Sequence, residues 1–355
     1  MGDETPPTIL GERGGPAVSR LAPERPVSTL TGTSRAMSSP TDQSHRPGPV
    51  RPEWRLDRRE FLQAGAAALA ALVAGASRLG AAPAPAPAGL RFGLVTDVHY
   101  ADADRRGANL YRESLGKLRE AVERLRADGA AFLAELGDFK DSVPGEPEAR
   151  TLDNLIAVEG EFQRFGGPTY HVLGNHDLDN LTKDQVLAHV TNTGVEAGSS
   201  FYAFTRGGIR FLVLDEEFTR DGRPYDRGHF DWRDINVPPP ELDWLSAQLA
   251  AGSAPVIVLG HQRLDGDGDV QVVNRAEVRA ILERSRRVLA VFQGHDHRGA
   301  YSRIGGIHYY TLRAMVEGSG PASNAYAMVE VHPDLSLTVT GYRRAVSMEL
   351  ARPGA

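Results

Sequence analysis

Cysteine is absent from this chain of 355 residues, and that absence removes several kinds of chemistry at once. The chain can form no disulfide, no thiolate zinc site and no lipidated cysteine. Any bound metal must therefore be held by His, Asp, Glu or Asn. An excess of positive charge is also lacking, because the formal net charge is -6. That balance argues against a broad nucleic-acid-binding face, which needs dense Lys and Arg, so no nucleic-acid partner is expected.

The first ninety residues differ from the rest of the sequence. Residues 1–56 are rich in Pro, Gly, Ser, Thr and Arg, which predicts a disordered extension. Arg58 and Arg59 then precede an Ala-rich run ending at Ala76, a pattern typical of a Tat-type export signal. A Pro- and Ala-rich linker completes the segment 57–89. We expect a chain exported by the Tat machinery to the periplasm or beyond the cell, in contact with the membrane only during export.

An uncleaved anchor is the alternative interpretation of the Ala-rich run. The run from Phe61 to Ala76 is shorter than the ~20 residues that cross a bilayer, which favours the signal. Signals also lie near chain starts, whereas this one follows a long extension. We therefore hypothesise that Met37 is the initiator and that residues 1–36 are a start-site artefact.

Alternating strand and helix patterns run from residue 90 to residue 345 and predict one domain, followed by a tail over 346–355. Apolar runs predict strands at 91–96, 130–136, 169–173, 200–206, 209–214, 255–259 and 288–293. Helical spacing covers 109–127, 149–165, 182–190, 238–251 and 275–283. Four further strands, expected to be antiparallel, cover 300–304, 307–312, 325–331 and 335–342. The fold class is α/β (α+β mixed), a four-layer αββα sandwich of two mixed β-sheets flanked by helices.

Polar motifs follow five of the predicted strands. Sites in such folds form at the carboxyl ends of strands, so we expect these loops to meet. Four of the loops have a glycine just before the polar group, which would let the backbone turn sharply. The five motifs are Asp97-Val98-His99, Gly137-Asp138, Gly174-Asn175-His176-Asp177, Gly260-His261 and Gly294-His295-Asp296-His297.

Taken together and in this order, the motifs resemble those of the calcineurin-like metallophosphoesterase family. They match its blocks D-x-H, G-D, G-N-H-D/E, a later H, and G-H-x-H over about two hundred residues. Within the family, FGLVTDVHYAD and YHVLGNHD are most similar to the manganese-dependent ADP-ribose/CDP-alcohol diphosphatase group.

The resemblance implies a role for each motif residue. His176 would lie beside the substrate phosphate as transition-state stabiliser or general acid, and Asp177 would orient it. Asp97, His99 and His297 would bind a first metal ion, Asn175, His261 and His295 a second, and Asp138 would bridge the two.

The implied function is hydrolysis of a phosphate ester or phosphoanhydride by in-line attack of a water that bridges two ions of Mn, Fe or Zn. The partner is then a small phosphorylated molecule. A nucleotide diphosphatase, a phosphomonoesterase and a phosphodiesterase all remain open, as does a non-catalytic exported binding protein. A metallo-β-lactamase type of hydrolase would need an H-x-H-x-D-H cluster, which the sequence lacks.

Several residues near the motifs have alternative interpretations. The long segment 218–240 is either a surface loop or a lid that touches substrate. The lid would use Arg223, Arg227, His229 and Arg233. Arg263, Arg298 and Arg313 either bind phosphate or form surface salt bridges. Asp141 either supports the metal site or makes a turn, and Asp296 either points away from its neighbouring histidines or orients them. Asp265, Asp267 and Asp269 are expected to form an acidic turn.

Overall fold

The computed structural model describes residues 89–229, 231, 233–266 and 271–353. The predicted extension and nearly all of the predicted export signal therefore lie outside the described residues. Within the part that is described, no helix has the length and apolar character that crossing a bilayer requires.

Two six-stranded sheets form the centre of the domain. The first sheet contains, in spatial order, β12 (Met348–Leu350), β11 (Leu337–Arg343), β10 (Ala325–Val331), β1 (Leu90–Val95), β2 (Leu133–Glu135) and β3 (Thr169–His171). The second contains β4 (Tyr202–Arg206), β5 (Ile209–Val213), β6 (Val256–Leu259), β7 (Val288–Gln293), β9 (Ile307–Thr311) and β8 (Ala300–Ile304).

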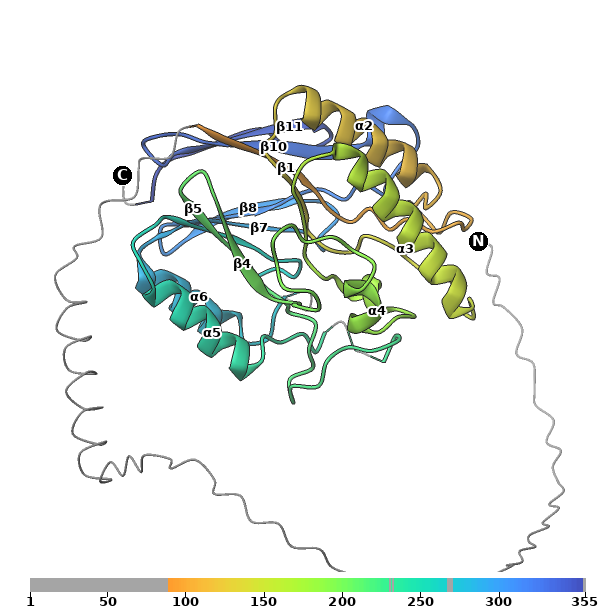
Figure 1. The fold of residues 1–355 in the computed structure, drawn as a ribbon, viewed down its shortest axis with the longest axis horizontal. Helices are drawn as coiled ribbons and strands as arrows, with labels where there is room; N and C mark the ends of the chain where they lie inside the picture. The colour runs from red at the N-terminus through yellow and green to blue at the C-terminus, as the bar shows by residue number, and fades with distance from the viewer. Residues whose placement is uncertain (1–88, 230, 232, 267–270, 354–355) are drawn as a thin grey trace, which may run out of the picture. The chain divides into compact units, whose positions relative to one another are not determined.

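Helices cover the outer face of each sheet, and Figure 1 shows one helix pair on each side. On the first sheet lie α2 (Glu113–Ala127) and α3 (Glu148–Phe162), and on the second α5 (Pro239–Ala250) and α6 (Arg275–Ser285). The short elements are α4 (Lys183–Leu187) and the 3-10 turns η1 (Gln163–Phe165), η2 (Asn175–Leu178) and η3 (Pro321–Ser323). The predicted αββα sandwich of mixed sheets is therefore confirmed.

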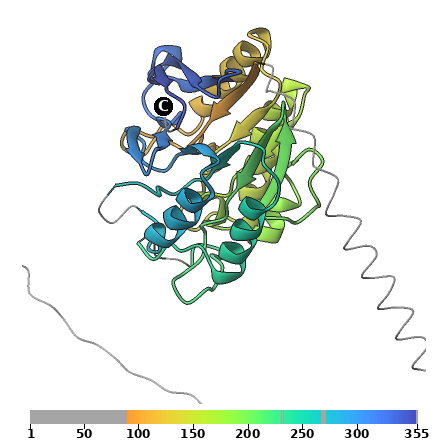
Figure 2. The same cartoon turned by 90° about the vertical axis from the view of Figure 1, so that its left-hand side faces the viewer.

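Alternation of side chains along the strands explains why the sheets have a helix on one face and a sheet on the other. In β1, Phe92 and Leu94 enter the core between the sheets, whereas Val95 packs with the helix side chains. In β6, Ile257 and Leu259 point inward and their neighbours outward. Figure 2 shows the two sheets face to face.

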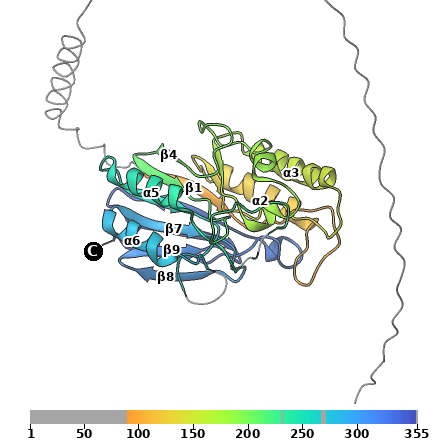
Figure 3. The same ribbon diagram turned by 90° about the horizontal axis from the view of Figure 1, so that it is seen from below.

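The parallel strands set the position of the functional site. β1, β2 and β3 are parallel in the first sheet, and β5, β6, β7 and β9 are parallel in the second. Figure 3 shows β7, β9 and β8 side by side. Seven carboxyl ends of parallel strands are thus available for polar loops.

Three sequence expectations need correction. The strands after residue 300 are not one antiparallel group, because β9 pairs in parallel with β7 and the two hairpins belong to different sheets. The helix expected from 109 begins at Glu113, because residues 109–112 form a bridge and turns. β12 extends the first sheet into the segment expected as a tail, where Leu350 is buried.

Candidate metal centre

The five motif loops meet at the carboxyl ends of β1, β2, β3, β6 and β7. Ligand atoms of Asp97, His99 and His297 lie within 4.8 Å of one another. Ligand atoms of Asp138, His261 and His295 also lie within 4.8 Å of one another and form a second group. Segments up to two hundred positions apart thus converge on two neighbouring groups, each able to hold a metal ion.

The Asp138 carboxylate lies between the two groups. Its Oδ2 is 3.2 Å from His261 Nε2 and 3.5 Å from His99 Nε2. Its Oδ1 accepts a hydrogen bond of 2.8 Å from the backbone N–H of His176. A carboxylate in this position could be shared by two ions.

Asn175 reaches the second group from the next loop. It is buried, and its Oδ1 accepts a hydrogen bond of 3.0 Å from Gln262 Nε2, in the residue that follows His261. The structure therefore brings six of the nominated ligands together in the two groups and holds Asn175 beside them through Gln262.

Unpartnered polar atoms show that this site fits cations. Asp97 Oδ1 and His261 Nε2 are buried and have no hydrogen-bond partner among the described residues. The Nε2 atoms of His99 and His297 face each other at 3.2 Å, a spacing that two ligands of one ion can adopt. Buried groups of this kind normally have a partner, and divalent ions bound by imidazole and carboxylate would supply it.

The surrounding charges favour the same conclusion. Burial alone would lower the pKa of His99, but the nearby carboxylates of Asp138, Asp141 and Asp97 outweigh it and raise the pKa to about 9. The pKa of His295 is instead lowered to about 4, by burial and by the neighbouring His261, so its imidazole stays neutral as a ligand must. Negative charge is therefore in excess around His99.

Four of the nominated ligands have a left-handed backbone, which is rare outside glycine. The φ angles are 48° at Asp97, 45° at His99, 58° at Asp138 and 66° at His295. Such conformations cost free energy and persist where the surrounding structure holds them in place. Here the backbone N–H of His99 donates to Asp138 O at 2.8 Å, which fixes two of the loops against each other.

The glycines of the motifs act mainly through their small size. Among the four, only Gly137, with φ 94°, has a left-handed backbone. At Gly174 an added Cβ would overlap the backbone nitrogen and the carboxylate of Asp138. Close packing of backbone against a nominated ligand therefore explains this glycine better than a turn does.

The outer nitrogen of each of three histidines is held by an acceptor. His99 Nδ1 lies 3.1 Å from Asp141 Oδ2, and His297 Nδ1 lies 3.2 Å from Glu317 Oε1. His261 Nδ1 lies 2.8 Å from the carbonyl oxygen of Leu136. These contacts aim each Nε2 at the centre, as is usual for metal-binding histidines. Asp141 thus supports His99.

His176 lies at the open side of the site, with its side chain 37% exposed. Its Nδ1 is 2.7 Å from Asp179 Oδ2 and 3.7 Å from Asp141 Oδ1. Burial lowers its pKa, but the carboxylates of Asp138, Asp141 and Asp179 together raise the pKa well above the usual value. The imidazole is thus oriented by two carboxylates.

The orienting role expected of Asp177 is wrong, because Asp179 has that contact. The Asp177 carboxylate instead accepts hydrogen bonds from the backbone N–H groups of Asp138, Phe139, Lys140 and Gly174, at 2.8 to 3.2 Å. Asp177 is the third residue of the 3-10 turn η2. A carboxylate at that position folds back and accepts a hydrogen bond from the backbone that precedes the turn. Asp177 therefore holds the Asp138 loop.

Sequence reasoning missed the acidic run that follows β5. Glu216 and Glu217 are fully buried. Glu216 Oε2 accepts from the backbone N–H of His261 at 3.1 Å, and Glu217 Oε1 accepts at 2.8 Å from the Gln262 amide that also holds Asn175. Burial raises the pKa of Glu216 to about 7. The available signal was three consecutive acids directly after an apolar parallel strand.

The arginines that flank the motifs separate into two kinds. Arg263 pairs with Asp265 at 3.2 Å and with Asp296 at 2.9 Å. Arg298 also pairs with Asp296, at 3.2 Å, so Asp296 binds arginines. Arg313 has no hydrogen-bond or ion-pair partner in the part of the chain that is described.

Of the three aspartates in the acidic turn expected after Arg263, only Asp265 lies among the described residues. Asp265 is fully buried and accepts a hydrogen bond of 2.7 Å from Ser302 Oγ, so it supports the fold beside the site. Asp267 and Asp269 lie outside the described residues.

The segment 218–240 packs beside the loop that carries His176. The backbone N–H of Gly228 donates to Leu178 O at 2.8 Å, and Arg227 pairs with Glu148 at 3.1 Å. Arg223 pairs with Asp221 at 2.9 Å. The segment thus forms a wall near the site, and the substrate contact expected of Arg223, Arg227, His229 and Arg233 stays a prediction.

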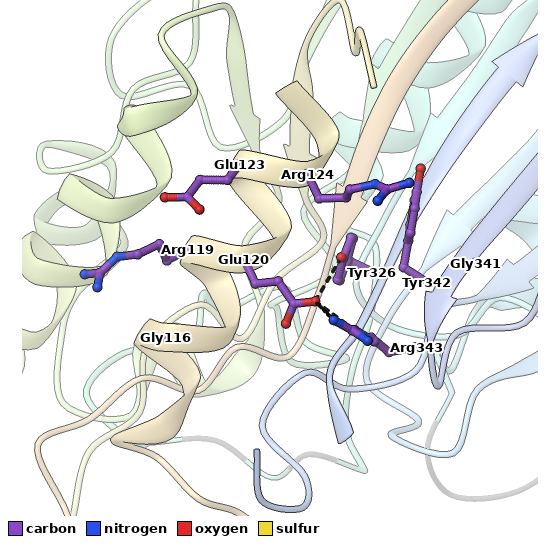
Figure 4. A pocket seen from close by; sticks show the side chains of 9 residues that line it. All are labelled: Gly116, Arg119, Glu120, Glu123, Arg124, Tyr326, Gly341, Tyr342 and Arg343. Carbon is purple, nitrogen blue, oxygen red and sulfur yellow. Dashed lines mark hydrogen bonds and ion pairs between the residues drawn. The ribbon is translucent and has the colours of Figure 1, made fainter. Parts of the chain in front are cut away.

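A groove elsewhere in the fold contains none of the nominated residues. It has a volume of about 690 Å³ and lies between α2 and the strands β10 and β11 (Figure 4). Its charges are paired within the protein. Arg343 Nε lies 2.8 Å from Glu120, and Arg124 lies 2.7 Å from Asp128.

Comparisons with known proteins agree with this geometry. The family model described as calcineurin-like phosphoesterase matches residues 90–299. A protein from Oryza sativa subsp. japonica named manganese-dependent ADP-ribose/CDP-alcohol diphosphatase is 30% identical over 292 residues, which are 70% of this chain and 90% of the relative. A human protein of the same name is 24% identical over 301 residues, covering 68% of this chain and 87% of the relative.

A solved structure is similar in fold. The crystal structure of a dimetal phosphatase from Danio rerio matches with a TM-score of 0.64 and 23% identity, covering 74% of this chain and 99% of that chain.

Proposed function

Because this chain belongs to the calcineurin-like phosphoesterase family, we propose that it hydrolyses a nucleotide-type phosphoanhydride at the centre described above. The broader activity is established: the chain is a dinuclear metal-dependent hydrolase of phosphate esters or anhydrides. The proposal concerns the substrate and the residues. It is supported above all by the convergence of seven potential ligands around one buried carboxylate, Asp138.

The proposed ligand sets follow the two groups in the structure. Asp97, His99 and His297 would hold one ion, and Asn175, His261 and His295 would hold the other, with Asp138 shared. Two bound cations would lower the pKa of a water molecule and neutralise charge on the phosphoryl group. Glu317, Asp141 and the Leu136 carbonyl keep the imidazoles aimed inward.

His176 is the proposed proton donor. Its Nδ1 is engaged by Asp179, so Nε2 is the nitrogen free to face the substrate. A protonated imidazole at this position gives a proton or a positive neighbour to the leaving oxygen. Asp179 and Asp141 act by holding the ring in place.

The substrate proposal is supported by the named relatives. Two of them, from rice and human, are called ADP-ribose/CDP-alcohol diphosphatases, and this chain covers 90% and 87% of their lengths. We therefore expect the P–O–P bond of a nucleoside diphosphate derivative to be cleaved faster than a simple phosphomonoester.

A substrate panel tests this proposal. The purified chain, with Mn²⁺ added, is assayed on ADP-ribose, p-nitrophenyl phosphate and bis-p-nitrophenyl phosphate. The expected result is the highest kcat/KM on ADP-ribose. A preference for the monoester or for the diester would contradict the substrate proposal. No turnover of any of the three would favour the non-catalytic binding protein.

We also propose that the chain is exported through the Tat route. The support is the Arg58-Arg59 pair before the Ala-rich run. Cell fractionation of the wild type and of a double variant, Arg58→Lys with Arg59→Lys, tests it. Export of the wild type with retention of the variant is expected, and equal distribution of both would contradict it.

A further inference from the structure

A small pocket lies beside the loop that carries His297. Its volume is about 170 Å³, and its wall includes Tyr301, Tyr310, Val346 and Met348 together with Arg298 and Arg313. Among its described lining residues there is no Asp or Glu. The pocket is therefore apolar in most of its wall and positively charged at one end.

Arg313 reaches this pocket from the end of β9, which is parallel to β7. The residue after it, Ala314, donates its backbone N–H to His297 O at 3.1 Å, so the position of Arg313 is fixed relative to a nominated ligand. Arg313 therefore follows the carboxyl end of a parallel strand, as the motif residues do.

The Arg313 side chain lacks a partner where its neighbours have one. Its Nε is buried with no hydrogen-bond partner among the described residues, whereas Arg263 and Arg298 share Asp296. The side chain runs over Gly299, where an added Cβ would lie 2.7 Å from Arg313 Cγ. A buried Nε–H without an acceptor is costly, and two phosphate oxygens can accept hydrogen bonds from one side of a guanidinium.

The apolar wall is unusual for this surface. Only three large hydrophobic side chains are markedly exposed among the described residues, and two of them line this pocket: Tyr301 at 41% and Val346 at 46%. An aromatic ring and aliphatic carbons beside a free guanidinium suit a ligand that carries both a planar group and a negative charge.

We infer that this pocket and its exposed rim bind the non-reacting half of the substrate, a nucleoside phosphate. Arg313 binds the phosphoryl group that is not attacked, and Tyr301 with Val346 contacts the base. This inference rests on the proposed function and makes it more specific, because a simple monoester has no group to fill the pocket.

Variants of Arg313 test the inference through a split between KM and kcat. Arg313→Met should raise the KM for ADP-ribose by roughly 10- to 100-fold, the value of one or two charge-assisted hydrogen bonds, with kcat little changed. Arg313→Lys should recover part of the loss, since it keeps the charge but not the fork. Turnover of p-nitrophenyl phosphate should be unaffected by both.

Arg303→Met is the matched control, because Arg303 lies on β8 at the same sheet edge and does not line the pocket. Its kinetics should equal those of the wild type. Circular dichroism melting of each variant confirms the fold. An unchanged KM for ADP-ribose in Arg313→Met, or an equal loss on p-nitrophenyl phosphate, would overturn the inference while leaving the hydrolase intact.

Calorimetry separates this inference from the substrate proposal. AMP is titrated into the manganese-loaded chain and into Arg313→Met and Tyr301→Ala. Binding to the wild type that weakens in both variants supports the pocket even if ADP-ribose proves a poor substrate. Absence of AMP binding to the wild type, or equal binding to all three, would contradict it.

Discussion

The metal centre and the groove of Figure 4 differ in how completely their polar groups are hydrogen-bonded within the protein. The groove is large, but Glu120, Arg343 and Tyr326 satisfy one another within it. In the metal centre, the buried atoms Asp97 Oδ1 and His261 Nε2 have no hydrogen-bond partner within the described chain and lie near other nominated ligands instead. The backbone is left-handed at four nominated ligands in the metal centre, but at Arg343 alone among the residues that line the groove.

The difference shows which features mark function in this fold. A groove whose charges pair within the protein needs no ligand to balance them. Its volume alone is therefore not evidence of function. A site with unpaired charge and left-handed backbone is held in a costly state by the rest of the fold, as functional sites often are. The same carboxylate-to-amide change should therefore have very different effects in the metal centre and in the groove.

The largest effect is expected from Asp138→Asn. The amide can keep the left-handed backbone, but it lacks the charge that lies between the two histidine groups. Activity on any phosphate substrate should fall by at least about 10³-fold. Steady-state kinetics with saturating Mn²⁺ measures the change. A variant that retains more than about a tenth of the wild-type activity would contradict the bridging role.

The next effect is expected from His176→Ala. If its Nε2 gives a proton to the leaving oxygen, kcat should fall by roughly 10²–10⁴-fold while metal content is unchanged. The loss should be smaller on p-nitrophenyl phosphate, whose leaving group needs less protonation. Equal losses on good and poor leaving groups would argue against a general acid.

Asp179→Asn tests the carboxylate that holds His176. We expect kcat to fall by roughly 10- to 100-fold with KM and metal content unchanged, because the ring loses its charged partner. Asp179→Glu should recover part of the activity. If Asp179→Asn retains full kcat, Asp141 alone orients the ring.

Asp177→Asn should act on stability more than Asp179→Asn does. An amide NH₂ would face at least one pair of backbone N–H donors, from Asp138 and Gly174 or from Phe139 and Lys140. The free energy of unfolding should drop by about 1–3 kcal/mol. Urea unfolding of the metal-free protein measures it, and an unchanged midpoint would contradict the capping role.

The smallest effect is expected from Glu120→Gln in the groove. Its partner Arg343 is about half exposed, so solvent screens the ion pair and it contributes little to stability. Activity should equal that of the wild type. A loss of activity here would show that the groove takes part in function and would remove the contrast between the metal centre and the groove.

The sequence was informative where a local pattern determines the structure. Apolar runs located every strand of the two sheets except β12, and motifs at strand ends located the seven nominated ligands, because parallel strands present their carboxyl ends at one edge. The three-residue strand β12 is too short for a periodic pattern to stand out.

Contacts between distant segments were not predictable from these patterns. Asp177 and Asp179 are both acids just after His176, and only the path of η2 decides which one contacts the imidazole ring. Glu217 meets Asn175 only through Gln262, across forty residues of intervening chain. The partners of Arg263, Arg298 and Arg313 likewise depend on how β7 and β9 align.

Metal analysis of the purified chain is the most direct test of the central claim that seven side chains hold two ions. Mass spectrometry of protein prepared without chelator, then dialysed and reconstituted with Mn²⁺, should give two ions per chain for the wild type and for Glu120→Gln. Asp138→Asn should hold fewer than two. A wild-type chain that binds one ion or none at saturating Mn²⁺ would contradict the account.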